Sequence, residues 1–350
     1  MKKSLLNRLV DPVSKSLLQL KIDDEKEGNV LTGSLVGERG EYPISNGIPR
    51  FVLTEDSDQL QTEESFGYKW QQVKTYDAPD VLENARRWLV ERYGFANVQE
   101  MRRFFANRRT ILDAGCGGGF SASLWLHSEW LDSGNAEWVG ADISAAIDVA
   151  QERLAGIPNT HFIQADVLEL PFAGETFDTI FSEGVLHHTP STERALKSLV
   201  PLLTQGGEIM FYVYRKKGAI REFTDDYVRD IVAAQAPEEA WETLRPLTKL
   251  GQALAELKVE VDVPEAIPYL GIEAGPIDVQ RLFYWHVAKL FWNEAYEFEQ
   301  NHHINFDWYH PRYAHRQTEE EVRRWCAEAG LSIIHCNVQE SGFTVRALKD

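Results

Sequence analysis

This 350-residue sequence has few cysteines and no long apolar run. It contains three cysteines, Cys116, Cys326 and Cys336, and three scattered thiols cannot form a disulfide framework or supply a zinc site by themselves. No apolar stretch approaches the roughly 20 residues that a membrane-spanning helix needs. The sequence therefore excludes a disulfide scaffold and predicts a soluble protein without a membrane partner.

Basic residues are also scarce relative to acidic ones. The chain has 36 Lys and Arg against 54 Asp and Glu, which gives a formal net charge of −18. A surface this acidic repels a polyanion, so a nucleic-acid partner is disfavoured, although a local basic groove stays open.

The first residues begin like a secretory signal, with two lysines ahead of leucines. Asn7, Arg8 and Asp11 then interrupt the apolar stretch that a signal needs, and no small-residue cleavage site follows. We therefore expect a cytoplasmic protein. Its 43% hydrophobic and 26% charged residues are a globular composition, and its length suggests about two domains.

Strand and helix patterns divide the sequence into a small unit, a helical connection, a core and an insertion. Residues 1–55 contain short alternating segments, and residues 56–105 read as a linker followed by lid helices. Strands alternate with helices over 106–217 and again over 306–350, which predicts an α/β core with a parallel sheet. Residues 218–305 are rich in helix and aromatic side chains, and predict a helical cap over the sheet edge where α/β folds bind ligands.

A glycine-rich turn follows the first core strand. That strand ends at Asp113, and residues 115–119 read Gly-Cys-Gly-Gly-Gly. Glycines allow a sharp turn and close approach to a ligand, and the next helix presents free N–H groups. The second and third strands end in Asp142 and Asp166, which can accept ribose hydroxyls and reach an adenine amino group. Together the three strand ends predict an adenosine site.

A nicotinamide dinucleotide is the main alternative ligand, because its fingerprint is also glycine-rich. That fingerprint reads G-x-G-x-x-G. Here the third glycine, Gly119, comes one residue early, and Phe120 stands where the fingerprint has Gly or Ala. The spacing therefore favours a ligand without phosphates, S-adenosylmethionine.

Several ordered motifs resemble those of the class I S-adenosylmethionine-dependent methyltransferases. Residues 113–119 are similar to the first motif of that family, and 165–172 and 177–188 resemble later motifs of its small-molecule branch. Residues 203–207 are similar to its Leu-x-Pro-Gly-Gly, with Gln205 in place of proline. The resemblance implies a Rossmann-like seven-stranded sheet with an antiparallel last strand, and S-adenosylmethionine as cofactor.

The same resemblance implies a cofactor site. It places Asp113 near the methionine end, Asp142 on the ribose, and Asp166 with Val167 at the adenine. Two aromatic residues ahead of the first strand would fold over the cofactor as a lid, or would pack the linker on the core. The other residues expected at the cofactor are Gly115, Cys116, Gly117, Gly119, Ile143, Ser182, Phe66 and Trp70.

The N-terminal unit has a likeness of its own. Residues 9–15 and 42–49 resemble the Trm112-like zinc-ribbon domain, whose pattern contains two Cys-x-x-Cys pairs. The positions aligned with those cysteines hold Asp11, Ser14, Leu35 and Glu38. Because tetrahedral zinc needs the missing sulfurs, we expect the ribbon-like unit without its metal.

Two histidines follow the fourth strand, beside the expected position of the transferred methyl group. His187 or His188 could orient or deprotonate the methyl acceptor, or could simply hold the loop. We favour the catalytic role for His188 and the structural role for His187.

Residues 305–316 are dense in side chains that bind polar or anionic molecules. They could line the acceptor pocket, or their aromatics could pack the insertion on the core. The expected catalytic residues here are Tyr309 and His315, and the expected substrate-binding residues are His310, Arg312, Tyr313 and Arg316. The histidines of this region fit no standard ligand spacing, so no metal is expected.

The predicted function is methyl transfer from S-adenosylmethionine to an oxygen, nitrogen, sulfur or carbon atom of a small-molecule acceptor. A tRNA- or protein-modifying methyltransferase is one alternative, and a non-catalytic S-adenosylmethionine-binding module is another. A homodimer is compatible with the sequence.

Overall fold

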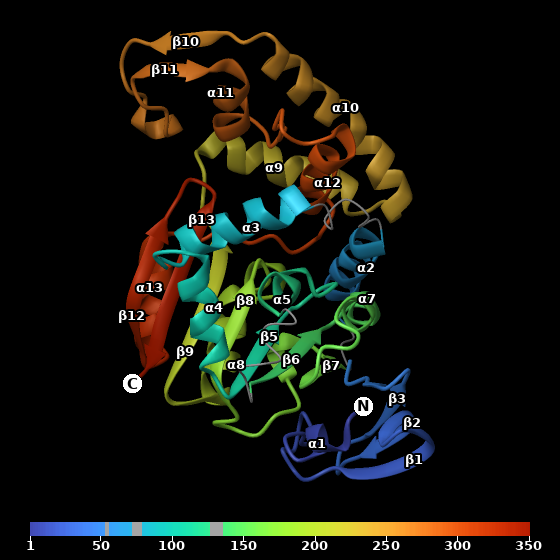
Figure 1. Ribbon diagram of the computed structural model, residues 1–350. Coiled ribbons are helices and arrows are strands. Elements are labelled where there is room, and N and C mark those ends of the chain that lie inside the picture. Colours follow the sequence, from blue (N-terminus) through green and yellow to red (C-terminus); the bar gives the residue numbers. More distant parts are fainter. Residues whose placement is uncertain (53–55, 72–78, 127–135) are drawn as a thin grey trace.

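The computed structural model describes residues 1–52, 56–71, 79–126 and 136–350. It shows a small β-sheet at one end, a central sheet with helices on both faces, and a cap at the opposite end (Figure 1). The last residues of the expected N-terminal unit, 53–55, lie outside the described residues. Among the described residues, none of the helices combines the length and the apolar character needed to cross a bilayer.

The central sheet has seven strands in the order β12-β13-β9-β8-β5-β6-β7. Its strands are β5 (Thr110–Ala114), β6 (Glu137–Asp142), β7 (Thr160–Gln164), β8 (Phe177–Glu183), β9 (Leu203–Tyr214), β12 (Leu331–Val338) and β13 (Gly342–Lys349). β13 is antiparallel to both of its neighbours, β12 and β9. The other neighbouring pairs, β9–β8, β8–β5, β5–β6 and β6–β7, are parallel. The predicted Rossmann-like sheet with its antiparallel last strand is confirmed.

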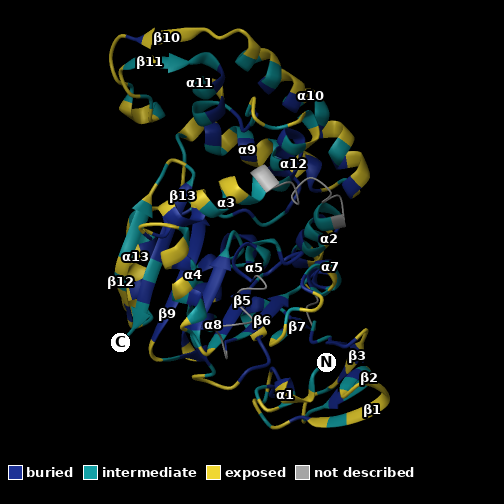
Figure 2. Cartoon of the chain, in the orientation of Figure 1, coloured by how far each residue is buried: buried dark blue, intermediate teal, exposed yellow. Residues whose placement is uncertain are grey.

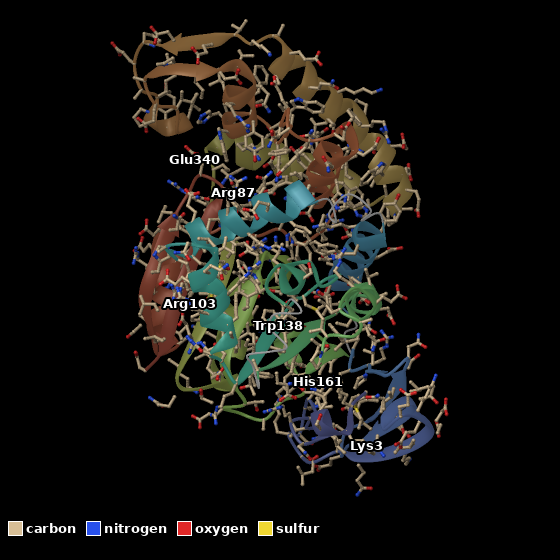
Figure 3. The ribbon with its side chains drawn as sticks, viewed as in Figure 1. Lys3, Arg87, Arg103, Trp138, His161 and Glu340 are labelled. Carbon is tan, nitrogen blue, oxygen red and sulfur yellow. The ribbon has the colours of Figure 1, made fainter. Side chains whose placement is uncertain are left out.

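Both faces of this sheet are buried by helices, as in other parallel sheets. Successive residues of a strand point to opposite faces, so neighbouring residues contribute to different apolar clusters. Ile111 and Trp138 belong to one apolar cluster and their neighbours Leu112 and Val139 to the other. Figure 3 shows Trp138 inside the core, in contrast to Arg103 on the outside of α4. The helices α4 (Val98–Ala106), α5 (Phe120–Trp125) and α7 (Ala146–Arg153) pack in the first cluster, and α8 (Thr192–Leu199) and α13 (Glu319–Glu328) in the second.

Short 3-10 turns connect several of these elements. They are η2 (Val167–Glu169), η3 (Leu186–His188), η4 (Val200–Leu202) and, in the cap, η5 (Pro268–Leu270). The predicted capping box of α13 is present, because Thr318 accepts from the backbone N–H of Glu321 and the Glu321 carboxylate accepts from that of Thr318.

The N-terminal unit is a four-stranded antiparallel sheet preceded by α1 (Lys3–Leu6). Its strands are β1 (Gln19–Lys26), β2 (Asn29–Val36), β3 (Glu41–Ser45) and β4 (Ile48–Pro49). The backbone N–H of Phe51 donates to the carbonyl of Gln164 (2.7 Å), so the chain runs along the β7 edge of the central sheet. Its apolar residues, including Leu35, share a cluster with Phe172 of the core, because so few residues cannot bury a core alone.

The carboxylate of Asp11 joins two loops of this unit. It accepts hydrogen bonds from the backbone N–H groups of Val13 (3.0 Å) and Ser14 (2.9 Å) in one loop and of Arg39 (3.0 Å) in the other. The hydroxyl of Tyr42 is its fourth donor, at 3.1 Å. Burial raises the pKa of Asp11, but these hydrogen bonds outweigh it and leave the pKa below the usual value.

Replacing Asp11 by alanine should destabilise the N-terminal unit by about 2–4 kcal/mol, because four donors to a charged acceptor would lose their partner. Denaturant unfolding measures the loss. In the native protein the contribution of Asp11 is present above pH 4 and is lost as the pH falls through its lowered pKa. Equal stability of the Asp11→Ala and Asp23→Ala variants, the latter at an exposed strand position, would contradict this role.

Two helices connect the small unit to the core. They are α2 (Ser57–Gln71) and α3 (Pro79–Arg92), and both lie between the core and the cap (Figure 1). Residues 72–78, part of the expected lid region, lie outside the described residues.

The insertion forms the cap, but it is not purely helical as predicted. Its elements are α9 (Ala219–Val232), α10 (Pro237–Glu256), β10 (Glu260–Val263), β11 (Gly275–Asp278), α11 (Val279–His286) and α12 (Phe298–Tyr309). β10 and β11 form an antiparallel hairpin at its exposed end (Figure 2). The expected boundary at 305/306 falls inside α12, whose helical hydrogen bonding runs on to Tyr309.

Candidate functional site

A cavity of about 730 Å³ lies at the carboxyl ends of β5, β6 and β8. Residues of the central sheet form its base, and residues of α2, α3 and the cap form its walls. Its size is within the range of small-molecule sites.

The glycine turn at the end of β5 forms part of this base. Gly115 and Gly117 both adopt a positive φ, at 82° and 52°. A Cβ on Gly115 would lie 2.3 Å from the side chain of Val185, and one on Gly117 would lie 2.5 Å from Nε1 of Trp70. Only glycine satisfies both the backbone conformation and the close approach.

Asp142, at the end of β6, holds this turn in place. One carboxylate oxygen accepts from the backbone N–H of Gly117 (2.8 Å), and the other accepts from the N–H (2.9 Å) and hydroxyl (2.6 Å) of Ser144. Asp142 lines the cavity together with Ile143. Burial raises the pKa of Asp142 above its usual value.

Further carboxyl groups lie near this end of the site. Burial raises the pKa of Asp113 to about 8, and Asp113 lies outside the cavity wall. Glu63 of α2 has its pKa raised to about 7, first by burial and then by the charges of Asp142 and Asp166. A cationic ligand beside these carboxyl groups would lower their raised pKa values, so the cluster favours a cation over a phosphate.

Asp166 and Val167 line the same end of the cavity, after β7. One oxygen of Asp166 accepts from the backbone N–H of Leu168 (2.9 Å), which begins the turn η2. The side chain is therefore fixed at the cavity edge, where the sequence predicted an adenine contact.

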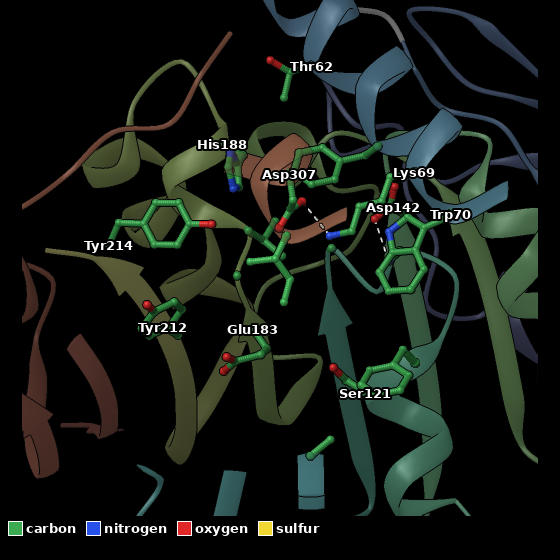
Figure 4. Close-up of a pocket in the computed structure, with 18 of the residues that line it drawn as sticks. Thr62, Lys69, Trp70, Ser121, Asp142, Glu183, His188, Tyr212, Tyr214 and Asp307 are labelled. Carbon is green, nitrogen blue, oxygen red and sulfur yellow. Dashed lines mark hydrogen bonds and ion pairs between the residues drawn. The ribbon is translucent and has the colours of Figure 1, made fainter. Parts of the chain in front are cut away.

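Helix α2 contributes Phe66, Lys69 and Trp70 to the cavity. Trp70 covers the glycine turn, and Lys69 forms an ion pair with Asp307 of α12 at 2.6 Å. Figure 4 shows this ion pair, with Asp142 and Trp70 on the same side as Lys69. Trp70 thus lies over the turn, whereas Phe66 lies in the cavity lining beside His188, and the ion pair connects α2 to the cap.

His188 lies on the opposite side of the cavity, beside Tyr214 (Figure 4). Its Nδ1 is 2.6 Å from the carbonyl oxygen of Tyr313, and its ring meets Phe66 edge-on with centroids 4.9 Å apart. Burial lowers the pKa of His188 to about 4, so the ring is neutral near pH 7. His187 is buried outside the cavity lining and packs on Tyr214, with ring centroids 3.7 Å apart.

Glu183 ends β8 at the cavity wall. Arg92 donates to one of its oxygens (2.8 Å) and the hydroxyl of Tyr93 to the other (2.5 Å). The guanidinium of Arg92 lies between the rings of Trp88 and Tyr212, with each centroid 3.9 Å away. Glu183 is therefore held rigidly by buried partners.

Four of the expected cofactor residues lie behind the cavity wall. Asp113 supports the turn from below, and Gly119 begins α5, where a Cβ would lie 3.1 Å from Ala150. The Ser182 hydroxyl donates to the carbonyl of Ala114 (2.9 Å) and links β8 to β5. Burial raises the pKa of the Cys116 thiol, which keeps it protonated. These residues shape the cradle instead of lining it.

Tyr309 faces away from the cavity, contrary to the expectation of a catalytic role. Its hydroxyl donates to Asp225 (2.8 Å) and accepts from the backbone N–H of Lys289 (2.9 Å). Asp307 does line the cavity, and two residues along an α-helix are about 200° apart. Tyr309 therefore points into the packed interior of the cap.

The segment after α12 also lies outside the cavity lining, and most of its side chains contact residues in α9, in α2 or just before α2. His310 contacts Ser65 (2.8 Å), and Tyr313 donates to Asp56 (3.1 Å). The remaining contacts are Arg312 with Asp230 (3.1 Å), Arg316 with Asp226 (2.7 Å), and the backbone N–H of His315 with the carbonyl of His187 (2.9 Å). The predicted substrate role of these residues is not supported.

Several cavity residues were not expected from the sequence. Lys69 and Asp307 stand inside segments that we singled out for their aromatics and histidines, but nothing local distinguished them. The helical period offers one signal for Asp307, because Asp307 lies on the same face of α12 as Ile304, which also lines the cavity. The other unexpected residues include Glu183, Tyr212, Tyr214 and Lys289.

Residues 111–207 match the methyltransferase domain family. The chain is 42% identical to an uncharacterised protein of Synechococcus sp. over 118 residues, which cover 32% of this chain and 27% of that protein. It is 38% identical to the tRNA U34 carboxymethyltransferase of a Shewanella species over 108 residues, or 30% of this chain and 31% of that one. The chain thus spans less than a third of the length of these two curated relatives.

A comparison with solved structures finds the magnesium protoporphyrin IX methyltransferase of Synechocystis with bound S-adenosylmethionine. It is 14% identical, with a TM-score of 0.42, over 85% of this chain and 100% of that one. The family match covers the strands that carry the glycine turn, Asp142 and Asp166. Over residues 111–207 the chain therefore contains a methyltransferase domain of the kind that uses S-adenosylmethionine.

Proposed function

We propose that this protein transfers the methyl group of S-adenosylmethionine to a small-molecule acceptor held beneath the cap. The observation that carries the proposal is the continuity of the cavity. The same cavity reaches from Gly117 and Asp142 to Tyr284, Phe291 and other aromatic residues of the cap. A cofactor and a second molecule can therefore meet inside it.

The residues present fit the cofactor. Gly115 and Gly117 line the cavity at a turn that has no room for a Cβ, and one oxygen of the buried Asp113 carboxyl lacks a hydrogen-bond partner among the described residues. S-adenosylmethionine supplies, when bound, an electrophilic methyl group on a positively charged sulfur. Asp142 would accept from the ribose hydroxyls while it holds the turn, and Asp166 would contact the adenine. The carboxyl groups of this end complement the cationic cofactor, because a nearby positive charge favours their ionised form.

His188 is placed to orient the acceptor and to take its proton. A carbonyl oxygen only accepts hydrogen bonds, so Nδ1 of His188 carries the hydrogen that bonds to Tyr313. In the neutral ring Nε2 then has a free lone pair, which can accept from an O–H or N–H group. The aromatic walls exclude water and align the acceptor, which supplies most of the expected rate.

Calorimetry with S-adenosylhomocysteine tests the cofactor part of this function. We expect saturable binding at one site per chain. Acceptors are then found by incubating the protein with S-adenosylmethionine and a panel of small aromatic and aliphatic nucleophiles, while S-adenosylhomocysteine is quantified. Absence of cofactor binding would refute the proposal, and binding without turnover of any acceptor would support the non-catalytic module instead.

Replacing His188 by asparagine should lower kcat by about 100-fold or more with an acceptor that carries a proton. The asparagine amide can keep the bond to Tyr313 but has no atom in place of Nε2. Because burial lowers the pKa of His188 to about 4, native kcat should stay level from pH 8 to pH 5 and fall only as the ring protonates below that. A native profile that falls already near pH 6.5 would contradict this assignment.

The alternative substrate is a tRNA, in view of the similarity to tRNA U34 carboxymethyltransferases. The net charge of −18 disfavours it. Turnover of a small acceptor that is retained in 0.5 M salt, where phosphate contacts are largely screened, supports the small-molecule function. Strong inhibition by salt together with methylation of added tRNA would favour the alternative.

For the N-terminal unit we infer a zinc-ribbon-like ancestry. Asp11 stands at the first aligned cysteine position, and its carboxylate joins the two loops that a metal would otherwise join. The role of the N-terminal unit is to complete the core beside β7. There its Arg50 forms an ion pair with Asp148 at 2.7 Å.

A further inference from the structure

We propose that the methyl acceptor is a planar aromatic molecule with an anionic group, and that Lys289 binds this group. The inference rests on the proposed function and specifies its substrate class. It depends on the position of one lysine in the cap and on the kind of side chains around it.

Lys289 is a buried cation in the cavity lining, 9% exposed. Its backbone N–H donates to Asp225 (3.1 Å) and to the Tyr309 hydroxyl (2.9 Å), so the start of the side chain is fixed. In the part of the chain that the structure describes, no carboxylate forms an ion pair with its Nζ, which lies 4.3 Å from the centroid of the Trp308 ring. By contrast, Lys69 in the same cavity is already paired with Asp307.

An unpaired buried cation is costly, and an anionic ligand would offset that cost. Burial, followed by the nearby positive charge of Arg221, lowers the pKa of Lys289 to about 7. Without a bound anion this lysine would therefore be readily neutral, and a bound carboxylate would restore its charge. This behaviour is expected of a ligand contact and not of a structural ion pair.

The walls around Lys289 favour a planar ligand. Tyr284 and Phe291 meet edge-to-face with centroids 5.9 Å apart, and Tyr212 and Tyr214 do so at the same separation. All four line the cavity. Aromatic faces and edges at these angles stack on a flat ring system better than on a flexible chain.

The carboxylate of the cofactor itself is the competing partner for Lys289. The position of Lys289 argues against that role, because Lys289 lines the cavity with Tyr284 and Phe291 of the cap, whereas the glycine turn and Asp142 belong to the central sheet. The cavity therefore has a cofactor end at the glycine turn and a cap end at Lys289. The experiment must therefore show whether Lys289 binds the cofactor or the methyl acceptor.

Calorimetry on the full chain saturated with S-adenosylhomocysteine provides this test. The probes are benzoate, 2-naphthoate and 9-anthroate, with 2-naphthamide as the neutral partner of 2-naphthoate. We expect at least one carboxylate to bind saturably, with 2-naphthamide at least tenfold weaker than 2-naphthoate. Lys289→Met should abolish this preference, Lys289→Arg should largely retain it, and Lys258→Met, at an exposed cap position, should leave it unchanged.

Binding should also depend on pH. Because the carboxylate pairs with protonated Lys289, its affinity should fall about tenfold per pH unit above pH 7, with uptake of one proton. The Lys289→Met variant should show neither effect. The charged and titratable groups that face Lys289 from neighbouring elements are Lys69, His187, Lys217, Arg221, Asp225, Asp307 and Tyr309.

The outcomes separate this inference from the proposed function. Unchanged affinity of Lys289→Met for S-adenosylhomocysteine, together with loss of carboxylate binding, supports it. Equal binding of 2-naphthoate and 2-naphthamide overturns it, as does the absence of binding by every carboxylate. A weakened affinity of Lys289→Met for S-adenosylhomocysteine assigns Lys289 to the cofactor and overturns the inference while leaving the methyltransferase function intact.

Discussion

Replacing Asp142 by asparagine should weaken the binding of S-adenosylhomocysteine by about 100-fold, close to 3 kcal/mol. The substitution preserves the size of the side chain, so the effect isolates its hydrogen-bonding chemistry. Titration calorimetry at pH 7.5 measures the change directly.

The reason lies in the donors that surround this carboxylate. Gly117 donates to one oxygen, and Ser144 donates through its N–H and hydroxyl to the other. An asparagine has a single acceptor oxygen, so its amide group must face a backbone N–H in either orientation. The glycine turn then loses its anchor, and the ribose hydroxyls lose one of two acceptors.

Glu152→Gln is the matched control, because Glu152 is an exposed residue of the following helix. It should bind the cofactor with native affinity. Circular dichroism should show that Asp142→Asn retains the fold, since the aspartate lies at the end of β6 and not in its interior. A native affinity in Asp142→Asn would place the cofactor elsewhere and remove the main support for the site.

Replacing Asp225 by alanine should destabilise the cap by about 3–5 kcal/mol, the largest effect that we expect on stability. Asp225 is 1% exposed and accepts from Arg221 (2.6 Å), the Trp308 indole (2.8 Å) and the Tyr309 hydroxyl (2.8 Å). The backbone N–H of Lys289 is a further donor, at 3.1 Å. Alanine would leave a buried guanidinium without its charged partner.

Denaturant unfolding measures this loss, and hydrogen exchange of α9 and α12 locates it. Asp230→Ala provides the control on the same helix, because Asp230 is exposed and its pair with Arg312 is worth little. It should change stability by less than about 0.5 kcal/mol. If both variants unfold alike, the Asp225 cluster does not hold the cap together.

The cradle could be predicted from the sequence because its determinants are local. A glycine turn between a strand and a helix encodes its own backbone conformation, and carboxylates at the ends of parallel strands meet at one sheet edge. Gly115, Gly117, Asp142 and Asp166 all lie at the cavity end where the sequence placed them. Alternation along the strands fixed the two buried faces in the same way.

The acceptor side could not be predicted because it depends on which partners long-range packing brings together. The sequence suggested that Arg312 and Arg316 bind an anionic substrate. In the structure they pair with Asp230 and Asp226 of α9. The sequence suggested that Tyr309 is catalytic. Its position on α12 directs its side chain toward Asp225, away from the cavity.

The sequence alone therefore determined the fold class and the cofactor, and it predicted the edge of the sheet at which the cofactor would bind, since these follow from residues close together in the chain. Only the tertiary structure decided that Lys69 is paired with Asp307 while no carboxylate of the described residues forms an ion pair with Lys289. These contacts join α2 to a cap more than two hundred residues away in the chain. The physical reason is that a charge is available to a ligand only when no neighbour in the folded protein has already paired with it.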